Sequence, residues 1–410
     1  MRYYVESYGC TMNYGEGRRL SADMASLGYA ESASAEEADI VILNTCTVVE
    51  STEKHMLSRI SELKRQGKEV IVTGCMARAQ PQRIEIRLPE SLIVTPGDYH
   101  LFAGMVAERY GVAGPPVPVN IGHSAILPIA QGCRGRCSYC ITKLARGDLV
   151  SYNPDGLVET FRDFVDGGAK EILITAQDTA CYGMDMGDSL PGLVGRMLST
   201  PGDYRVRIGM MNPNNLMRIC EDLVSTFDDD RMYRFLHIPV QSGSDAVLGR
   251  MRRQYTVSQF MELVDEVRAM CPDVSIATDI ITGFPGETDE DHRLSMDLIR
   301  ELRADTVNIT RFSPRPGTDA FSMAPVHGRI VKDRSAELTE LKNATELDVN
   351  SALVGKEFVS LATEEGKEGT IVRTGNYRPV VVRDEIPLGT FVKVRVTENR
   401  PTYLMGETVQ

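Results

Sequence analysis

The sequence predicts an α/β protein in three successive parts: an N-terminal α/β domain over 1–111, a central partial (β/α) barrel with six parallel strands over 121–350, and a small antiparallel β-barrel over 351–410. Apolar strand-like runs alternate with helical segments through the first two parts, which is typical of parallel sheets covered by helices. The last part changes to short strands separated by glycine-containing turns. The Pro/Gly/Val run GVAGPPVPVN at 111–120 marks the linker between the first two parts.

In the N-terminal part, three strand-like runs each end at a cysteine. RYYVESYG, DIVILNTC and EVIVTGC lead to Cys10, Cys46 and Cys75. Ligand sites in parallel sheets lie at the carboxyl ends of the strands, so we expect these thiols to converge at one edge. Gly9 and Gly74 allow tight backbone turns beside two of them. The alternative is three buried structural thiols.

The central part contains six strand candidates, separated by helical segments such as 154–166 and 257–270. The candidates are AILPIAQ, EILITAQ, YRVRIGMM, RFLHIPVQ, VSIATDIIT and DTVNITRFS. Active sites of barrels are built at the carboxyl ends of the strands, so polar residues at those ends are candidate site residues. His237 lies inside an apolar strand and is expected to be a packed core residue.

A cysteine loop, GCRGRCSYC, follows the first of these strands and places Cys133, Cys137 and Cys140 in C-x3-C-x2-C spacing. Iron–sulfur cubanes are normally held by four thiolates. Three thiolates leave one iron open to bind another molecule, much as a catalytic zinc keeps an open position. A zinc knuckle would need a fourth ligand at knuckle spacing, and none follows. Three core cysteines are the other alternative.

Composition limits the function further. The chain has 410 residues, 42% hydrophobic and 25% charged, with a net charge of −12, which argues against a broad basic surface for nonspecific DNA binding. No run approaches the ~18 apolar residues of a membrane helix, and MRYYVESYGCTMN lacks a signal-peptide core. We therefore expect no membrane association and a cytoplasmic location, where nine cysteines favour ligation over disulfides. A basic group surrounds the cysteine loop, with a solvated face as the alternative: Arg134, Arg136, Lys143 and Arg146, opposed by Asp148.

The whole chain resembles the radical SAM (S-adenosylmethionine) methylthiotransferase family. The motifs that carry the resemblance are SYGCTMN, ILNTCTV, VTGCMA, QGCRGRCSYCITKLARG, HIPVQSGSDAVLGRMRRQYT and TDIITGFPGET. The resemblance implies an N-terminal methylthiotransferase domain with an auxiliary cluster (1–111), a radical SAM domain (121–350) and a TRAM-like RNA-binding domain (351–410).

The resemblance also implies SAM and two [4Fe–4S] clusters. Cys133, Cys137 and Cys140 would hold the cluster that binds SAM, and Cys10, Cys46 and Cys75 the auxiliary cluster. One SAM would methylate a sulfur, and another would supply the radical that removes hydrogen from an unactivated C–H bond before methylthio insertion. Further SAM-binding candidates, for which helix capping or turn contacts are the alternative, are Tyr139, Gln177, Asp178, Gln241, Ser242, Arg253 and Asp279.

The stretch SYCITKLARGDLVSY resembles the archaeal and eukaryotic branch, which acts on N6-threonylcarbamoyladenosine next to the anticodon. The implied partners are the tRNA anticodon loop, a low-potential donor of the flavodoxin or ferredoxin type, and a sulfur source. Gln177-Asp178 departs from the Glu-Asp pair expected there, which affects how the SAM amino group is bound. In the last domain, Tyr377, Arg378 and Arg373 are expected to contact exposed RNA bases.

Several functions remain open from the sequence. The same chemistry on a ribosomal-protein aspartate, or on a different adenosine derivative in tRNA, is the first alternative. A radical SAM enzyme with another insertion chemistry is the second. A non-catalytic RNA-binding protein with structural or redox-sensing clusters is the third, and the C-terminal barrel as a structural cap is compatible with each.

Overall fold

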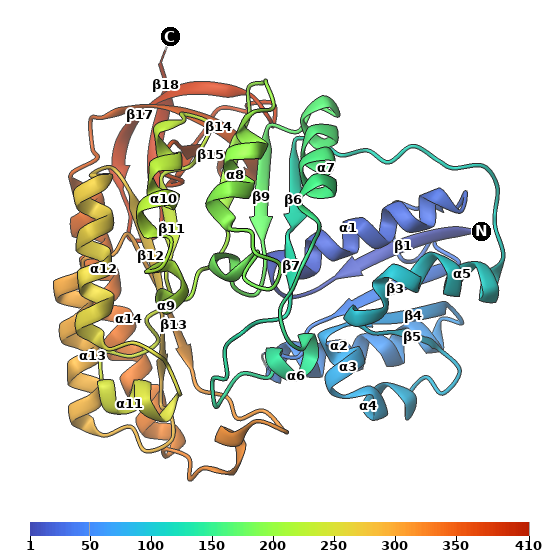
Figure 1. The fold of residues 1–410 in the computed structure, drawn as a ribbon, viewed down its shortest axis with the longest axis horizontal. Coiled ribbons are helices and arrows are strands. Elements are labelled where there is room, and N and C mark those ends of the chain that lie inside the picture. The colour runs from blue at the N-terminus through green and yellow to red at the C-terminus, as the bar shows by residue number, and fades with distance from the viewer. Residues whose placement is uncertain (49, 410) are drawn as a thin grey trace. The chain divides into compact units, whose positions relative to one another are not determined.

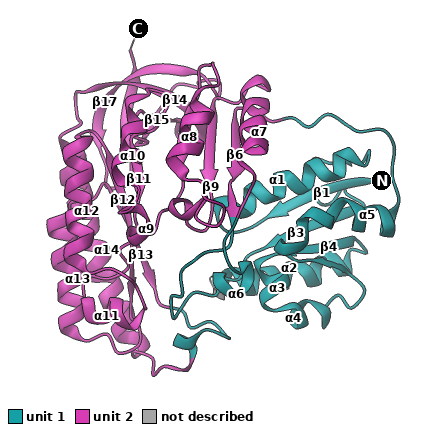
Figure 2. Cartoon of the chain, in the orientation of Figure 1, with its two compact units in different colours: residues 1–120, 131–150, 313–321 teal, residues 121–130, 151–312, 322–410 magenta. Residues whose placement is uncertain are grey.

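The computed structural model describes residues 1–48 and 50–409. They form two compact units, coloured separately in Figure 2. Unit 1 contains residues 1–120, 131–150 and 313–321, and unit 2 contains residues 121–130, 151–312 and 322–410. The cysteine loop after the first barrel strand therefore belongs to the same unit as the N-terminal residues.

Unit 1 is built on a five-stranded parallel sheet in the order β2-β1-β3-β4-β5. Figure 1 labels β1, β3, β4 and β5 of this sheet. Alternate residues of its central strand pack against helices on the two faces: Val41 and Leu43 on one, Ile40 and Ile42 on the other. A strand covered on both faces must be apolar throughout, which explains the run IVIL. The strands are β1 (Arg2–Ser7), β2 (Ala30–Glu31), β3 (Ile40–Thr45), β4 (Glu69–Gly74) and β5 (Leu92–Val94).

Helices cover both faces of this sheet. Met56, Ile60 and Leu63 of α2 pack on one face, while Leu20 and Met24 of α1 pack on the other. The helical elements of unit 1 are α1 (Thr11–Ser26), α2 (Glu50–Arg65), α3 (Cys75–Ala79), α4 (Pro81–Glu85), η1 (Pro96–Leu101), α5 (Phe102–Tyr110) and α6 (Thr142–Arg146).

Unit 2 contains the six predicted parallel strands, arranged as two three-stranded sheets, β6-β9-β10 and β11-β12-β13. A bridge between Val206 and Met232 links β10 to the segment before β11. In the described part of the chain, β6 and β13 each pair on one side, so the barrel is partial, as predicted. The strands are β6 (Ser124–Pro128), β9 (Glu171–Thr175), β10 (Arg205–Ile208), β11 (Phe235–His237), β12 (Ser275–Thr282) and β13 (Thr306–Arg311).

Most helices of unit 2 begin at a side-chain cap, with α9 and α10 as exceptions. In α12, Thr256 and Gln259 form a reciprocal capping box, which fixes the predicted start of the helix. The helices are α7 (Pro154–Asp166), α8 (Leu190–Leu198), α9 (Pro213–Leu216), α10 (Cys220–Ser225), α11 (Asp245–Arg250), α12 (Val257–Met270), α13 (Asp289–Leu302) and α14 (Gly328–Ser351). No helix in the described ranges is long and apolar enough to cross a membrane.

The C-terminal segment closes into the small β-barrel that the sequence predicts, in the order β14-β15-β16-β18-β17. The barrel is not antiparallel throughout, because β16 and β18 pair in parallel. Closure leaves no open strand edge, and a core of valines with Ala362 and Leu404 fills it. The strands are β14 (Glu357–Gly366), β15 (Gly369–Thr374), β16 (Pro379–Val382), β17 (Phe391–Asn399) and β18 (Leu404–Thr408).

Candidate functional site

Three N-terminal cysteines lie at one edge of the unit 1 sheet. Cys10 precedes α1, Cys46 directly follows β3, and Cys75 is the first residue of α3 after β4. Their strands, β1, β3 and β4, are direct neighbours in the sheet. The carboxyl ends of neighbouring parallel strands therefore bring the three thiols together at the edge where such folds bind ligands.

The electrostatics of these thiols show that they lie close to one another. Burial raises the pKa of Cys75 to about 11, with the charges of Cys46 and Cys10 adding to the rise and that of Arg146 opposing it. Burial also raises the pKa of Cys46, and the charge of Cys10 adds to it. Thiolates so placed repel each other unless a cation or metal centre compensates them. A coordinating thiol is deprotonated outright, so the set fits a metal cluster.

Gly9 allows the backbone beside Cys10 to approach Cys46 closely. Its φ is +103°, and a Cβ there would lie 2.9 Å from Cys46 Sγ. Gly74 has φ +85°, and its Cβ would meet the Thr45 carbonyl oxygen at 2.2 Å. Only glycine satisfies both the conformation and the space at these positions.

The backbone of the cysteine loop at 133–140 lies close to the thiols of that loop. The Gly135 N–H donates to Cys133 Sγ at 3.2 Å. A Cβ on Gly135 would lie 3.3 Å from Cys133 Sγ and 3.8 Å from Cys137 Sγ. Burial raises the pKa of Cys140, and the charge of Cys137 adds to the rise. Three thiols on one short loop thus face one small volume.

The two thiol sets do not form single-ion sites. In residues 1–48 and 50–409, no three Cys, His, Asp or Glu side chains are placed to hold one metal ion. A cubane differs from a single ion because each thiolate binds a separate iron. Soft thiolates are ligands of iron–sulfur clusters and of zinc alike.

Arg146 follows the 133–140 cysteine loop in the sequence and contacts one of the N-terminal thiols. It ends α6, six residues after Cys140, and its side chain is 1% exposed. Its Nε lies 3.3 Å from Cys75 Sγ, its Nη1 is ion-paired with Glu16, and its Nη2 donates to Asn13 Oδ1 at 2.5 Å. Although burial opposes the charge, the charges of Cys75 and Glu16 hold the pKa of Arg146 well above its ordinary value.

This network corrects the expected basic face around the cysteine loop. Arg146 is buried, and Lys143 pairs with Asp148 at 2.5 Å. Arg134 and Arg136 are the two members that stay exposed. Counting charges near the loop in the sequence could not reveal that Arg146 is buried and paired. Its partner Glu16 lies 130 positions away in the sequence.

A distant segment, 313–321, also contacts both cysteine regions of unit 1. Arg315 is ion-paired with Glu53, both 4% exposed, and its Nη2 donates to Thr47 Oγ1 at 3.0 Å. The Ala320 N–H donates to the Ser138 carbonyl at 2.8 Å. Thr47 follows Cys46, and Ser138 lies between two thiols of the loop. Sequence reasoning missed this segment because SPRPGTDAF has no periodic pattern.

In unit 2, three of the predicted SAM-binding residues lie together. Asp279 on β12 is within the electrostatic range of Arg253, and its carbonyl accepts from the Gln241 N–H at 2.8 Å. Gln241 has φ +76°, and its Oε1 is buried without a partner. The buried Oε1 is an acceptor that an amine would satisfy.

Asp279 is also part of a hydrogen-bonded row across the strands. It accepts from His237 Nε2 at 2.9 Å and from Asn308 Nδ2 at 2.8 Å. Burial would raise the pKa of Asp279, but His237, Asn308 and the charge of Arg253 bring it below its ordinary value. The expectation that His237 is a packed core residue is wrong, because its ring is a polar partner of this carboxylate.

The other predicted SAM-binding residues are placed differently. Asp178 is 1% exposed and accepts from the Asn212 N–H at 3.0 Å and Asn215 Nδ2 at 2.7 Å, which anchors the start of α9. Ser242 Oγ accepts from the Ser244 N–H at 3.2 Å, the turn contact that was the alternative. Two further candidates are half-buried: Tyr139 in the cysteine loop of unit 1 and Gln177 just after β9 in unit 2.

The aromatic and basic residues expected to contact RNA have partners in the central strands and in the C-terminal barrel. The Tyr377 ring meets the Tyr233 ring edge-on with centroids 4.8 Å apart. Arg373 pairs with Glu364 at 2.8 Å, and Arg378 pairs with Asp305. With these contacts the three side chains are half-buried, and their contact with RNA stays a prediction.

Comparison with known proteins decides the family. Three family profiles match in order: "Uncharacterized protein family UPF0004" over 2–95, "Radical SAM superfamily" over 127–299 and "TRAM domain" over 352–409. "Probable threonylcarbamoyladenosine tRNA methylthiotransferase" proteins match along their lengths: 37% identity in Pyrococcus horikoshii, covering 100% of both chains, and 38% in Archaeoglobus fulgidus, covering 99% of this chain and 98% of that protein. "Threonylcarbamoyladenosine tRNA methylthiotransferase" of Xenopus laevis is 33% identical, covering 100% of this chain and 77% of that protein.

The chain belongs to the radical SAM methylthiotransferase family. Membership confirms the resemblance read from the cysteine motifs and the enzyme class it implied. SAM and an iron–sulfur cluster are the cofactors of this class. The three thiols of the 133–140 loop fit such a cluster, because they leave one ligand position for SAM.

Solved structures of other SAM-dependent radical enzymes share the fold of this chain without adding to its function. The radical SAM methyltransferase TsrM from Kitasatospora setae, with tryptophan and a SAM analogue bound, has a TM-score of 0.57 at 14% identity, covering 76% of this chain and 73% of that one. The cobalamin-dependent SAM radical enzyme OxsB has a TM-score of 0.52 at 12% identity, covering 83% and 56%. At such identities the likeness concerns the fold alone.

Proposed function

We propose that this methylthiotransferase converts N6-threonylcarbamoyladenosine next to the anticodon of a tRNA into its 2-methylthio derivative, in the cytoplasm. One observation carries the proposal: two sets of three thiols lie in one compact unit, and Arg146, on the short helix that follows the second set, contacts Cys75 of the first. Insertion of a methylthio group needs both a radical source and a sulfur-bearing centre. The end-to-end similarity to proteins named for this tRNA nucleoside supports the substrate.

The two cofactor sites are assigned by position. Cys133, Cys137 and Cys140 would hold the [4Fe–4S] cluster that binds SAM, while the second, auxiliary cluster would be held by Cys10, Cys46 and Cys75. Together these groups would supply the reduction and the radical chemistry that an unactivated C–H bond requires. Electrons would come from a low-potential flavodoxin- or ferredoxin-type donor. The inserted sulfur would come from the auxiliary cluster itself or from an added sulfur source.

The chain's own residues bind and orient in this scheme. Gln241, Arg253 and Asp279 are proposed to contact SAM, because Gln241 Oε1 is an unsatisfied buried acceptor and Asp279 is kept ionised. Tyr139 and Gln177 remain proposed SAM contacts on the loops that follow β7 (Ala130–Gln131) and β9. For Asp178 and Ser242, the observed contacts favour shaping the site over touching SAM.

The Arg146 network has a separate role in the proposal. Its ion pair with Glu16 keeps a positive charge beside Cys75 in a place that water does not reach. That charge favours the thiolate over the thiol, which is the form a cluster binds. The TRAM-like domain is also proposed to bind the tRNA.

Nucleoside mass spectrometry of tRNA tests the function. In a strain lacking this gene, the 2-methylthio derivative should disappear and N6-threonylcarbamoyladenosine should accumulate. A copy encoding the wild-type chain should restore the derivative, and a C137A copy should not. Normal levels of the derivative in the deletion strain would overturn the substrate, and loss of a modified ribosomal-protein aspartate there would favour the first alternative.

A further inference from the structure

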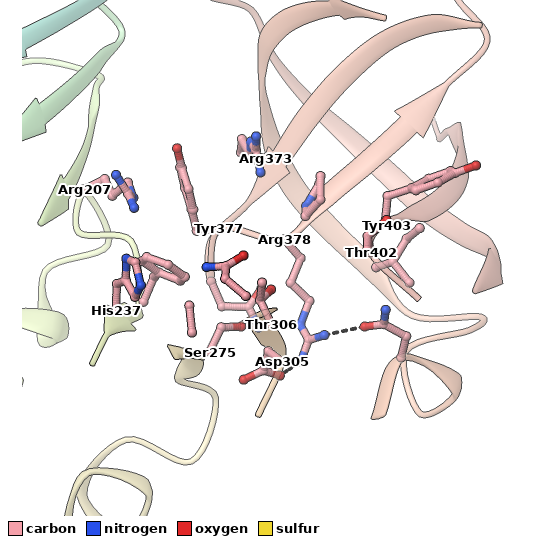
Figure 3. A pocket seen from close by; sticks show the side chains of 17 residues that line it. Arg207, His237, Ser275, Asp305, Thr306, Arg373, Tyr377, Arg378, Thr402 and Tyr403 are labelled. Carbon is pink, nitrogen blue, oxygen red and sulfur yellow. Dashed lines mark hydrogen bonds and ion pairs between the residues drawn. The ribbon is translucent and has the colours of Figure 1, made fainter. Parts of the chain in front are cut away.

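A cavity of about 390 Å³ lies in unit 2 between the central strands and the C-terminal barrel (Figure 3). Its walls come from β11, from the first half of β12 and β13, from Arg207 on β10, from Asn350 on α14, and from the 373–379 and 402–404 segments of the C-terminal barrel. The volume is in the range of small-ligand sites, which are often found where two domains meet.

Unsatisfied donors gather around this cavity. Arg207 Nε, Ser275 Oγ, Arg373 Nε and Arg378 Nε are all buried and have no hydrogen-bond partner. Ser275 is only 2% exposed. Buried polar groups in native proteins are normally paired, and leaving one unpaired destabilises the fold. Four unpaired groups around one cavity point to a ligand that supplies acceptors.

The charges of the lining residues identify the kind of acceptor. Arg373 and Arg378 have carboxylate partners in Glu364 and Asp305. Arg207 has none in the described chain; its guanidinium carbon lies 5.1 Å from the Phe235 ring centroid and 5.0 Å from that of Tyr377. The two rings fix the guanidinium in place and leave its charge uncompensated. A planar fixed guanidinium is suited to bind a carboxylate or a phosphate.

The position of Arg207 favours a carboxylate over an RNA phosphate. Its Nε is fully buried, and the cavity reaches only the first half of β12, Ser275 and Ala277. The phosphates of a folded RNA loop lie on its outside, whereas a group attached to a base can enter a cavity. His237 and Asn308 line the cavity and also bind Asp279, two residues or about 7 Å further along the strand than Ala277.

We propose that this cavity binds the N6-threonylcarbamoyl group of the tRNA nucleoside, with Arg207 holding its carboxylate. The inference rests on the proposed function. The group has a planar urea, a hydroxyl and one carboxylate, and it extends several bonds from the adenine ring. Ser275, Thr306 and Asn308 supply neutral hydrogen-bonding groups for the urea and hydroxyl. The cavity thereby distinguishes the modified nucleoside from plain adenosine.

Binding of two synthetic anticodon stem-loops, identical except for the threonylcarbamoyl group, tests the subsite. Fluorescence anisotropy on the reconstituted enzyme should show tighter binding of the modified RNA by the wild type. R207M should reduce this preference roughly 10- to 100-fold, because it removes a charged hydrogen-bonding partner. R207K should retain part of it. S275A should reduce it less.

R205M is the matched control. Arg205 lies two residues before Arg207 on β10 and stacks over the Phe391 ring at 4.9 Å, but it does not line the cavity. It should keep the wild-type preference. Equal weakening of both RNAs by R207M would indicate a phosphate contact and overturn the proposal.

The outcomes separate the subsite from the function. No preference in the wild type would contradict the proposed substrate itself. A clear preference in the wild type that survives in both R207M and S275A would overturn the subsite alone. S275A, a small truncation, keeps the test decisive if R207M does not fold.

Discussion

Arg146 and Arg207 are two largely buried arginines with opposite surroundings. Arg146 in unit 1 contacts Glu16, Asn13 and Cys75. Arg207 in unit 2 contacts two aromatic rings and no carboxylate in the described residues. A buried charge whose partners are all within the chain holds the structure together, whereas one without a partner is available to a ligand. The comparison separates a positioning residue from a candidate substrate contact.

Iron content gives the largest expected difference between the two regions. After anaerobic reconstitution the wild type should hold about eight irons, as two cubanes require. C75A should hold about four and lose methylthio product while keeping SAM cleavage. R207M should still hold about eight. Metal analysis checks this, and eight irons in C75A would remove Cys75 from the auxiliary cluster.

The next largest difference between Arg146 and Arg207 should be in the free energy of unfolding. R146M leaves the Glu16 charge buried without its partner, which typically destabilises a protein by about 3–5 kcal/mol. Urea unfolding followed by circular dichroism suits a chain without tryptophan. R300M is the control, because the Arg300–Asp297 pair is 53% and 68% exposed and should contribute at most about 1 kcal/mol.

A double substitution tests whether the loss comes from the orphaned carboxylate. R146M/E16L replaces the pair with apolar side chains and should recover much of the stability that R146M alone loses. Iron binding should recover less, since the charge beside Cys75 is still missing. If the double variant is as unstable as R146M, packing around Arg146, and not the charge of Glu16, accounts for the effect.

The hydrogen bonds that His237 and Asn308 donate to Asp279 should make a smaller, pH-dependent contribution to the stability of the fold. Because its pKa lies below the ordinary 3.8, ionised Asp279 stabilises the folded state above that pH, and this contribution is lost as the pH falls through the lowered value. D279N should therefore cost about 1 kcal/mol at neutral pH and progressively less below pH ~4. Urea midpoints of wild type and D279N across pH 3–7 measure it; a difference that stays constant with pH would contradict the assignment.

R207M should have the smallest effect on stability. It removes contacts with two rings but no ion pair, so the expected change is about 1 kcal/mol or less. Its effect should appear in RNA discrimination instead. A loss of stability comparable to that of R146M would show that Arg207 is structural and would end the contrast between the two sites.

The sequence predicts much of this structure because the relevant patterns are local. Runs such as IVIL and VIV identify buried parallel strands, and a cysteine after a strand is placed by the strand itself. The C-x3-C-x2-C loop carries its ligand geometry within eight residues. Capping residues such as Thr256 fix the ends of helices for the same reason.

The contacts that the sequence did not predict join residues far apart in the chain. Arg146 with Glu16 and Arg315 with Glu53 are buried pairs that no periodicity reveals. His237 looks apolar in its strand context, and its partner Asp279 comes 42 residues later. The turn of Gly, Asn, Tyr and Arg around Tyr377 likewise gives no sign of Tyr233, the residue against which Tyr377 packs.

The most direct test of the account is nucleoside analysis after reaction of the reconstituted enzyme with tRNA bearing N6-threonylcarbamoyladenosine, SAM and a reductant. The wild type should form the 2-methylthio derivative, C137A should form neither 5′-deoxyadenosine nor product, and C46A should form 5′-deoxyadenosine without product. Formation of the derivative by C46A would contradict the claim that the two thiol sets of unit 1 act together.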